Sequence, residues 1–144
     1  KKMDVFTHNP VLGHINTFGG HPVSCAAGHA AMLVLMDEKI IDSVFEKEKL
    51  FLNALHSPKI KSIKSKGLMI ALEFESFEYN KKVIDALIQM PGAVTSPEKT
   101  NDVAVFTDWF LFAPECMRIA PPLTISPEEI TMVCAIINKT LDKI

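Results

Sequence analysis

The stretch IKSIKSKGLMIALEF, residues 60–74, decides the fold. Apolar side chains recur at every second position from residue 68 to residue 74, and a period of two is typical of a β-strand with one buried face. Four lysines lie between residues 59 and 66, and we interpret them as the solvated face of a strand. Gly67 supplies a pivot, so the stretch predicts a strand or hairpin. One predicted face carries Leu68, Ile70, Leu72 and Phe74, and the other carries Met69, Ala71 and Glu73.

Helical patterns precede the predicted hairpin. A helix is expected to start at Pro22. Proline has no backbone N–H, and the N–H of the first helical position makes no hydrogen bond within the helix, so proline fits there. Small residues follow as far as Ala31 and allow close backbone approach, so we expect this helix to be buried against a partner element. Apolar residues at intervals of three and four predict a second helical run from Ile40 to Leu55.

Two further helices are expected after the hairpin. Helical spacing returns from Tyr79 to Met90, where Pro91 and Gly92 follow. The last helix starts with the clearest signal in the chain, because Ser126 and Glu129 have the spacing of a capping box.

The region between these two helices is harder to assign. Residues 95–102 are polar and indicate a loop, and Ala104–Thr107 and Met117–Ala120 are predicted strands on either side of Asp108-Trp109-Phe110. The nearby aromatic residues are interpreted as an aromatic core under the sheet. The sequence therefore predicts an α/β (α+β) fold in which helices cover one face of a small, mostly antiparallel sheet, preceded by a connector helix.

Composition narrows the classes of function. A chain of 144 residues with 48% hydrophobic content is long enough for one core, and a net charge of -2 makes nucleic acid an unexpected partner. The longest apolar stretch, residues 26–36, is shorter than the roughly 20 residues of a membrane span, and the start of the chain lacks the pattern of a signal peptide. Three widely spaced cysteines favour free thiols. We therefore expect a cytoplasmic protein with no membrane partner.

The first candidate site is HINTFGGHP, residues 14–22. Two glycines allow a tight turn, and the hydroxyl of Thr17 beside a helix start could help to hold an anion. Taken alone, these residues favour the simpler interpretation of a tight turn before a helix. Cys25 and His29 have a spacing that metal ligands use, but no second pair matches them, so no metal site is predicted.

The second candidate is Arg118, in CMRIAPP, residues 116–122. An arginine among apolar residues on a strand needs an anion, and its planar fork suits a carboxylate. The anion could be a substrate, or it could be Glu73 or Asp108 of the same domain. The residues alone do not decide between these two interpretations.

Three motifs in order resemble the C-terminal part of class III aminotransferases of fold type I, the ornithine and acetylornithine type. The first is the segment 14–22 with the Cys-Ala-Ala helix that follows it. The second is SKGLMIA, residues 65–71, and the third is RIAPPLTI, residues 118–125. Together they cover nearly the whole chain.

The resemblance implies site residues and a cofactor. Thr17 is expected to bind the phosphate of pyridoxal 5'-phosphate across the interface of a homodimer with shared active sites, assisted by Asn16. Arg118 is expected to receive a carboxylate of the substrate. No catalytic residue is assigned, because the family's lysine is expected upstream of residue 1, and this chain alone is therefore expected to be inactive.

The implied function is transfer of an amino group between an amino donor (ornithine, acetylornithine, lysine or similar) and a 2-oxo acid. Residues 1–38 would be a connector loop and helix from the end of the large domain, and residues 39–144 the C-terminal small domain. The alternatives are another class III member, such as a 4-aminobutyrate aminotransferase or an aminomutase, and a non-catalytic α/β ligand-binding or interaction module.

Overall fold

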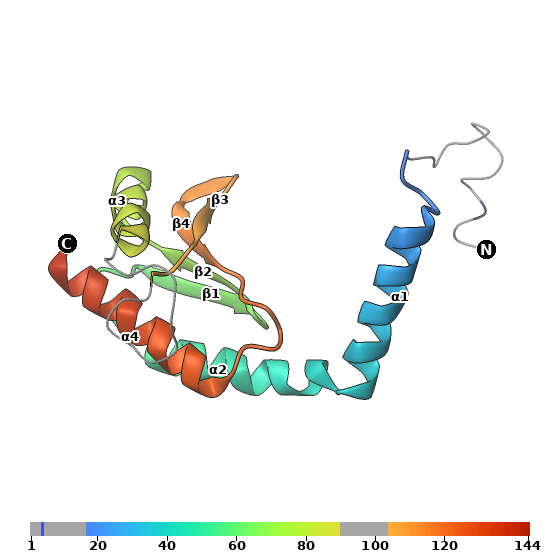
Figure 1. Ribbon diagram of the computed structural model, residues 1–144. Coiled ribbons are helices and arrows are strands. Elements are labelled where there is room, and N and C mark those ends of the chain that lie inside the picture. Colours follow the sequence, from blue (N-terminus) through green and yellow to red (C-terminus); the bar gives the residue numbers. More distant parts are fainter. Residues whose placement is uncertain (1–3, 5–16, 90–103) are drawn as a thin grey trace. The chain divides into compact units, whose positions relative to one another are not determined.

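The computed structural model describes Asp4, residues 17–89 and residues 104–144, and it divides the chain into two compact units between Lys39 and Ile40 (Figure 1). The predicted loop at 95–102 lies outside the described residues. The first unit contains helix α1 (Pro22–Asp37). The second contains the sheet and the other helices of the described chain.

Helix α1 begins at Pro22, as the sequence predicts. His21 precedes it in an extended conformation and gives no side-chain hydrogen bond to the helix end. None of its residues is buried by the rest of the described chain, and large apolar side chains such as Val23 and Met36 are about 70% exposed. The expected burial against a partner element is therefore not provided by the described residues.

The second unit is built on a four-stranded antiparallel sheet (Figure 1). Its strands are β1 (Ser62–Lys66), β2 (Met69–Glu73), β3 (Asp108–Phe110) and β4 (Ala113–Ile119). They lie in the order β1-β2-β4-β3, so β4 returns from the far part of the chain to pair with β2.

The hairpin β1–β2 confirms the prediction from residues 60–74. Gly67 turns the chain with a φ of +59°, in the left-handed region that favours glycine. Ile70 and Leu72 are fully buried, whereas Met69 between the turn and Ile70 is 51% exposed. The predicted alternation of the two faces is therefore confirmed.

The prediction for the later strands is partly wrong. Ala104–Thr107 is not a strand; instead the backbone amide of Val105 donates a hydrogen bond to the carbonyl of Leu87, at the end of a helix. The strand is Asp108–Phe110, which pairs with β4, and β4 begins at Ala113, four residues earlier than predicted. The bounds of β3 follow from its pairing with β4. A strand of three residues is too short for its alternation to be recognised in the sequence.

The aromatic residues near β3 do not form a core under the sheet, which corrects the second prediction for this region. Phe106 is 73% and Phe112 97% exposed. Trp109 contacts the ring of Phe77 edge to face, with 5.3 Å between centroids, but it is still 38% exposed. Phe106 lies in an irregular segment and Phe112 at the end of the β3–β4 hairpin, whereas Trp109 is covered in part by Phe77 at the start of α3.

The helices follow the predicted order with small differences in their bounds. The run predicted from Ile40 divides into a 3-10 turn, η2 (Ile40–Ser43), and helix α2 (Val44–Ala54). Helix α3 (Phe77–Ile88) begins two residues earlier than predicted, because the hydroxyl of Ser76 accepts a hydrogen bond from a backbone amide of its first turn. Helix α4 (Pro127–Lys143) has the predicted capping box at its start.

A single core lies on one face of the sheet. Neighbouring positions of β2 and β4 on this face are buried together with apolar residues of α2, α3 and α4, so all three helices cover the same side. The fully buried side chains of this core include Phe51, Ile70, Leu72, Phe74, Val83, Leu87, Met117, Ile130, Ile137 and Leu141. Within the described ranges no helix is both long enough and apolar enough to span a bilayer.

The turn at Gly67 generates a test of the hairpin. Gly67→Ala should lower the free energy of unfolding by about 1–3 kcal/mol, because alanine is strained at this φ and its Cβ would lie 2.9 Å from Cγ1 of Val44. Chemical denaturation measures the change. The same substitution in a Val44→Ala background should cost less, and a Gly67→Ala variant as stable as the parent would contradict the described turn.

Candidate functional site

The alternation of β4 places Arg118 on the open face of the sheet. Its neighbours Met117 and Ile119 are 0% and 8% exposed, since both point into the core. The residue between them must then point to the opposite side. The side chain of Arg118 is accordingly 43% exposed.

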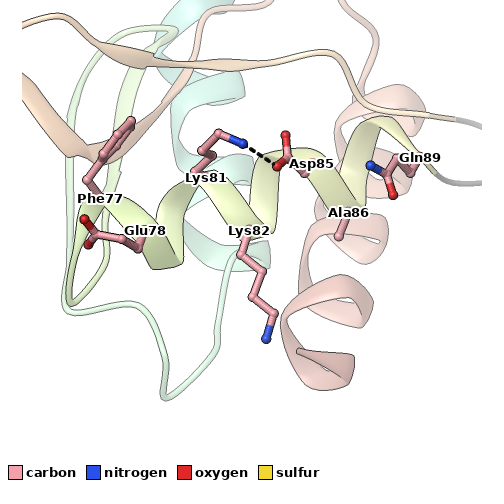
Figure 2. A pocket seen from close by; sticks show the side chains of 7 residues that line it. All are labelled: Phe77, Glu78, Lys81, Lys82, Asp85, Ala86 and Gln89. Atoms are coloured by element: carbon pink, nitrogen blue, oxygen red, sulfur yellow. Dashed lines mark hydrogen bonds and ion pairs between the residues drawn. The ribbon is translucent and has the colours of Figure 1, made fainter.

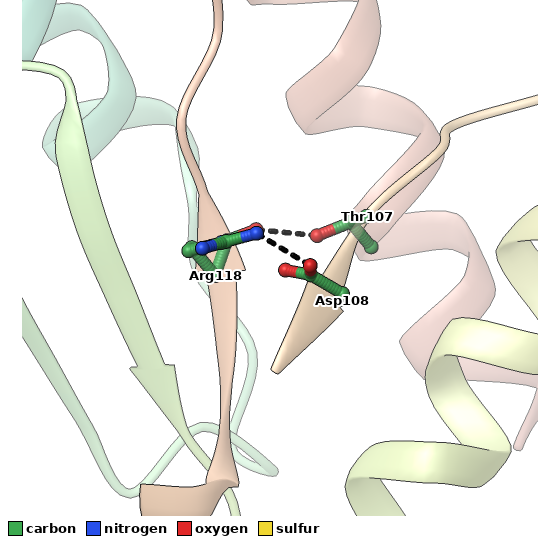
Figure 3. Close-up of polar contacts among 3 residues, drawn as sticks. All are labelled: Thr107, Asp108 and Arg118. Carbon is green, nitrogen blue, oxygen red and sulfur yellow. Dashed lines mark hydrogen bonds and ion pairs between the residues drawn. The ribbon is translucent and has the colours of Figure 1, made fainter. Parts of the chain in front are cut away.

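Asp108 is the partner of Arg118 within the described chain. The two residues lie directly opposite each other on β3 and β4, and Nη2 of Arg118 donates a hydrogen bond of 2.5 Å to Oδ2 of Asp108 (Figure 3). The hydroxyl of Thr107 donates to the backbone carbonyl of Arg118 and ties the start of β3 to β4. The carboxylate of Asp108 is 51% exposed, so the ion pair faces solvent.

A hollow of about 310 Å³ lies beside this pair. It is lined by Phe106, Thr107, Asp108, Arg118 and Ala120. Arg118, Asp108 and Thr107 therefore line a space large enough for a small acid, and Phe106, which is exposed, adds an apolar residue to the lining.

Glu73, the other acid considered for Arg118, has partners of its own. Its Oε2 accepts a 2.6 Å hydrogen bond from Oγ of Ser62 and lies 3.6 Å from Nζ of Lys64. The hydrogen bond from Ser62, together with the positive charge of Lys64, lowers the pKa of the Glu73 carboxyl despite some desolvation. On β4 its cross-strand neighbour is Cys116, whose thiol has a raised pKa, first because it is buried and then because Glu115 and Glu73 are nearby.

Thr17 lies in the first unit, in the turn that leads into α1. It is exposed, and the turn continues through Gly20, with a φ of +76°, to His21, whose amide donates to the carbonyl of Phe18. Asn16, the second predicted cofactor residue, lies outside the described residues. Thr17 and Arg118 belong to different units of the chain.

The start of α1 offers part of the donor set that a phosphate group needs, since Pro22 has no amide hydrogen and the amide of His21 is bonded to the carbonyl of Phe18. The hydroxyl of Thr17 is accessible, and no side chain caps the first turn of the helix. Backbone amides at a helix start and a nearby hydroxyl together suit an anion. The described residues of this unit are therefore compatible with a partial contact to a phosphate group.

A second hollow, of about 460 Å³, lies along α3 (Figure 2). Its charged side chains largely neutralise one another, with Nζ of Lys81 2.8 Å from Oδ2 of Asp85. Phe77, Glu78, Lys82, Ala86 and Gln89 complete its lining. It shares no residue with the hollow beside Arg118, and we assign no role to it.

The family model of class III aminotransferases matches residues 1–141. The chain belongs to this aminotransferase family. Among curated relatives, it is 31% identical over 140 residues to an ornithine aminotransferase of Bordetella pertussis, with 91% of this chain and 30% of the relative covered. It is 30% identical over 144 residues to a [LysW]-aminoadipate semialdehyde transaminase of Deinococcus radiodurans, with 98% of this chain and 30% of the relative covered.

Solved aminotransferases share the fold of this chain. The ornithine aminotransferase of Toxoplasma gondii superposes with a TM-score of 0.70 at 28% identity, covering 96% of this chain and 30% of that one. The acetylornithine aminotransferase of Elizabethkingia anophelis superposes with a TM-score of 0.70 at 24% identity, covering 91% and 32%. The chain thus spans about 30% of the length of the aminotransferases that it matches.

The sequence pattern singled out Arg118 and predicted the strand that carries it, but it did not predict the neighbouring strand β3, which carries its partner Asp108. Asp108 was considered only as one of two possible partners. The available signal was the short run Asp108-Trp109-Phe110 itself, in which one polar residue is followed by two aromatic ones, and three residues are too few to establish a strand period.

The half-exposed ion pair generates a stability prediction for this aminotransferase chain. Arg118→Lys should change the free energy of unfolding by less than about 1 kcal/mol, because exposed ion pairs contribute roughly 0.2–1 kcal/mol. Thermal and chemical denaturation measure the effect. A loss of several kcal/mol would show that the guanidinium serves the fold, as the alternative interpretation of Arg118 requires.

Proposed function

We propose that the complete protein is a pyridoxal 5'-phosphate-dependent aminotransferase that moves an amino group between an amino donor and a 2-oxo acid. Family membership supports the reaction class. The observation that carries the proposal is Arg118 on the open face of the sheet, already holding a carboxylate at 2.5 Å beside a hollow of about 310 Å³. Relatives named for ornithine, acetylornithine and aminoadipate semialdehyde support a donor of the ornithine, acetylornithine or lysine type.

Arg118 would bind and orient the substrate carboxylate. The described structure gives the guanidinium one hydrogen bond to a side chain, through Nη2, and Arg118 lines the hollow beside Asp108, so that further donors of its fork would be available to a ligand there. A planar fork that accepts two carboxylate oxygens fixes the direction of the ligand as well as its position. Orientation of this kind lowers the cost of bringing the reacting atoms together.

Thr17 and Asn16 would bind the phosphate of the cofactor. The accessible hydroxyl of Thr17 and the start of α1 support this assignment for Thr17. When bound, pyridoxal phosphate supplies the electron sink for the amino-group transfer. This chain would contribute binding and charge at the phosphate and at the substrate carboxylate.

The proposal includes a homodimer with shared active sites and a cytoplasmic location. Thr17 would reach a cofactor that is held mainly by the other subunit, which requires at least two copies. Helix α1 gives indirect support, because its apolar side chains find no cover among the described residues. The three free cysteines agree with a reducing compartment.

The role of Thr17 is tested by cofactor retention. In the complete protein, Thr17→Ala should weaken the affinity for pyridoxal phosphate by about 10- to 150-fold, because a hydrogen bond to a charged group contributes about 1.5–3 kcal/mol. Equilibrium dialysis against free cofactor measures the affinity. Thr17→Ser keeps the hydroxyl and should retain most of it, whereas unchanged affinity in Thr17→Ala would restore the interpretation as a simple tight turn.

The role of Arg118 is tested by kinetics. Arg118→Lys keeps the charge but loses the planar fork, so kcat/KM for the oxo-acid acceptor should fall on the order of a hundredfold. Lys64→Gln removes a charge from β1 on the same face and serves as the matched control, with little effect expected. Undiminished kcat/KM in Arg118→Lys would remove the substrate role from this residue.

A further inference from the structure

We propose that Asp108 sets how strongly Arg118 binds carboxylates, acting as a built-in counter-charge that weakens their binding. This inference rests on the proposed function of Arg118 as the receptor of the substrate carboxylate. It adds a residue that determines affinity through Arg118 and does not itself take part in the reaction.

The geometry makes Asp108 a constant neighbour of the guanidinium. The two residues are opposite one another in the β3–β4 register, and the bond from Thr107 to the carbonyl of Arg118 holds the two strands together at this position. On its other side, Arg118 lies opposite Ala71 of β2, which has no charge. Asp108 is therefore the acidic side chain that the sheet places against Arg118 (Figure 3).

The contact occupies part of the guanidinium and leaves room for a ligand. It joins a single nitrogen, Nη2, to a single oxygen, Oδ2, at 2.5 Å. Arg118 and Asp108 are 43% and 51% exposed, and both line the hollow of about 310 Å³. A carboxylate that enters this hollow would meet the donors of Arg118 and the negative charge of Asp108 together.

The sign of the effect follows from charge. With Asp108 ionised, the pair is close to neutral, so an arriving carboxylate gains less attraction than a lone arginine would give it. Removal of the Asp108 charge should then strengthen carboxylate binding. Because the pair is half exposed and screened by solvent, the expected gain is about two- to fivefold, the size of an exposed ion-pair interaction.

The test is calorimetric titration of the complete, cofactor-loaded protein with glutarate, a five-carbon dicarboxylate that has no amino or oxo group to react. Asp108→Asn keeps the size of the side chain and an oxygen acceptor but removes the charge. Its dissociation constant for glutarate should be about two- to fivefold lower than that of the parent at low salt. The difference should shrink in 0.5 M sodium chloride, roughly where the Debye length falls to a few ångströms.

A matched control removes a charge from the same face without touching Arg118. Glu73→Gln changes an acid that is paired with Ser62 and Lys64. The dissociation constant of this variant for glutarate should therefore stay within about twofold of the parent value. Equal gains in Glu73→Gln and Asp108→Asn would mean a general field effect and would overturn the specific role of Asp108.

Arg118→Gln separates this inference from the proposed function. If Arg118→Gln weakens glutarate binding while Asp108→Asn leaves it unchanged or weaker, the receptor role stands and the counter-charge role fails. If Arg118→Gln does not change the dissociation constant, the receptor role fails and the inference fails with it. In the Arg118→Gln background Asp108→Asn should have no further effect, since Asp108 acts through Arg118.

Discussion

Successive side chains of strand β4 point to opposite faces of the sheet, and the rest of the second unit depends on this alternation. Met117 and Ile119 close the core against α2, α3 and α4, and they are almost completely buried. When every second residue of a strand is buried in the core, the residues in between point to the opposite face of the sheet. The burial that stabilises the domain therefore also holds Arg118 outward, so that core packing and the proposed carboxylate binding depend on the same backbone register.

The open face separates its charges into two groups. Glu73 is held by Ser62 and Lys64 at the side of β1, whereas Arg118 pairs with Asp108 at the side of β3. Each of these two acids thus has its own cationic partner. Among the described residues, the ion pair of Arg118 is therefore separate from the ion pair of the hairpin β1–β2. The proposed receptor arginine can respond to a ligand without disturbing the partners of Glu73.

Elements with several turns or a clean period were predictable from the sequence, and elements defined by a distant partner were not. The alternation at 68–74, Pro22 at the start of α1 and the capping box at Ser126 are local signals, and the structure confirms all three. Strand β3 owes its existence to pairing with β4, which a three-residue pattern does not reveal. Arg118 could be selected from its apolar neighbours, but the choice of Asp108 over Glu73 as its partner required the strand register.

The central claim is that Arg118 receives a carboxylate in the hollow beside Asp108. A crystal structure of the complete, cofactor-loaded protein with bound glutarate tests this most directly. We expect carboxylate oxygens of glutarate at about 3 Å from two guanidinium nitrogens of Arg118, in the bidentate arrangement that arginine favours. Glutarate bound with both carboxylates elsewhere, while Arg118 contacts only Asp108, would contradict the account.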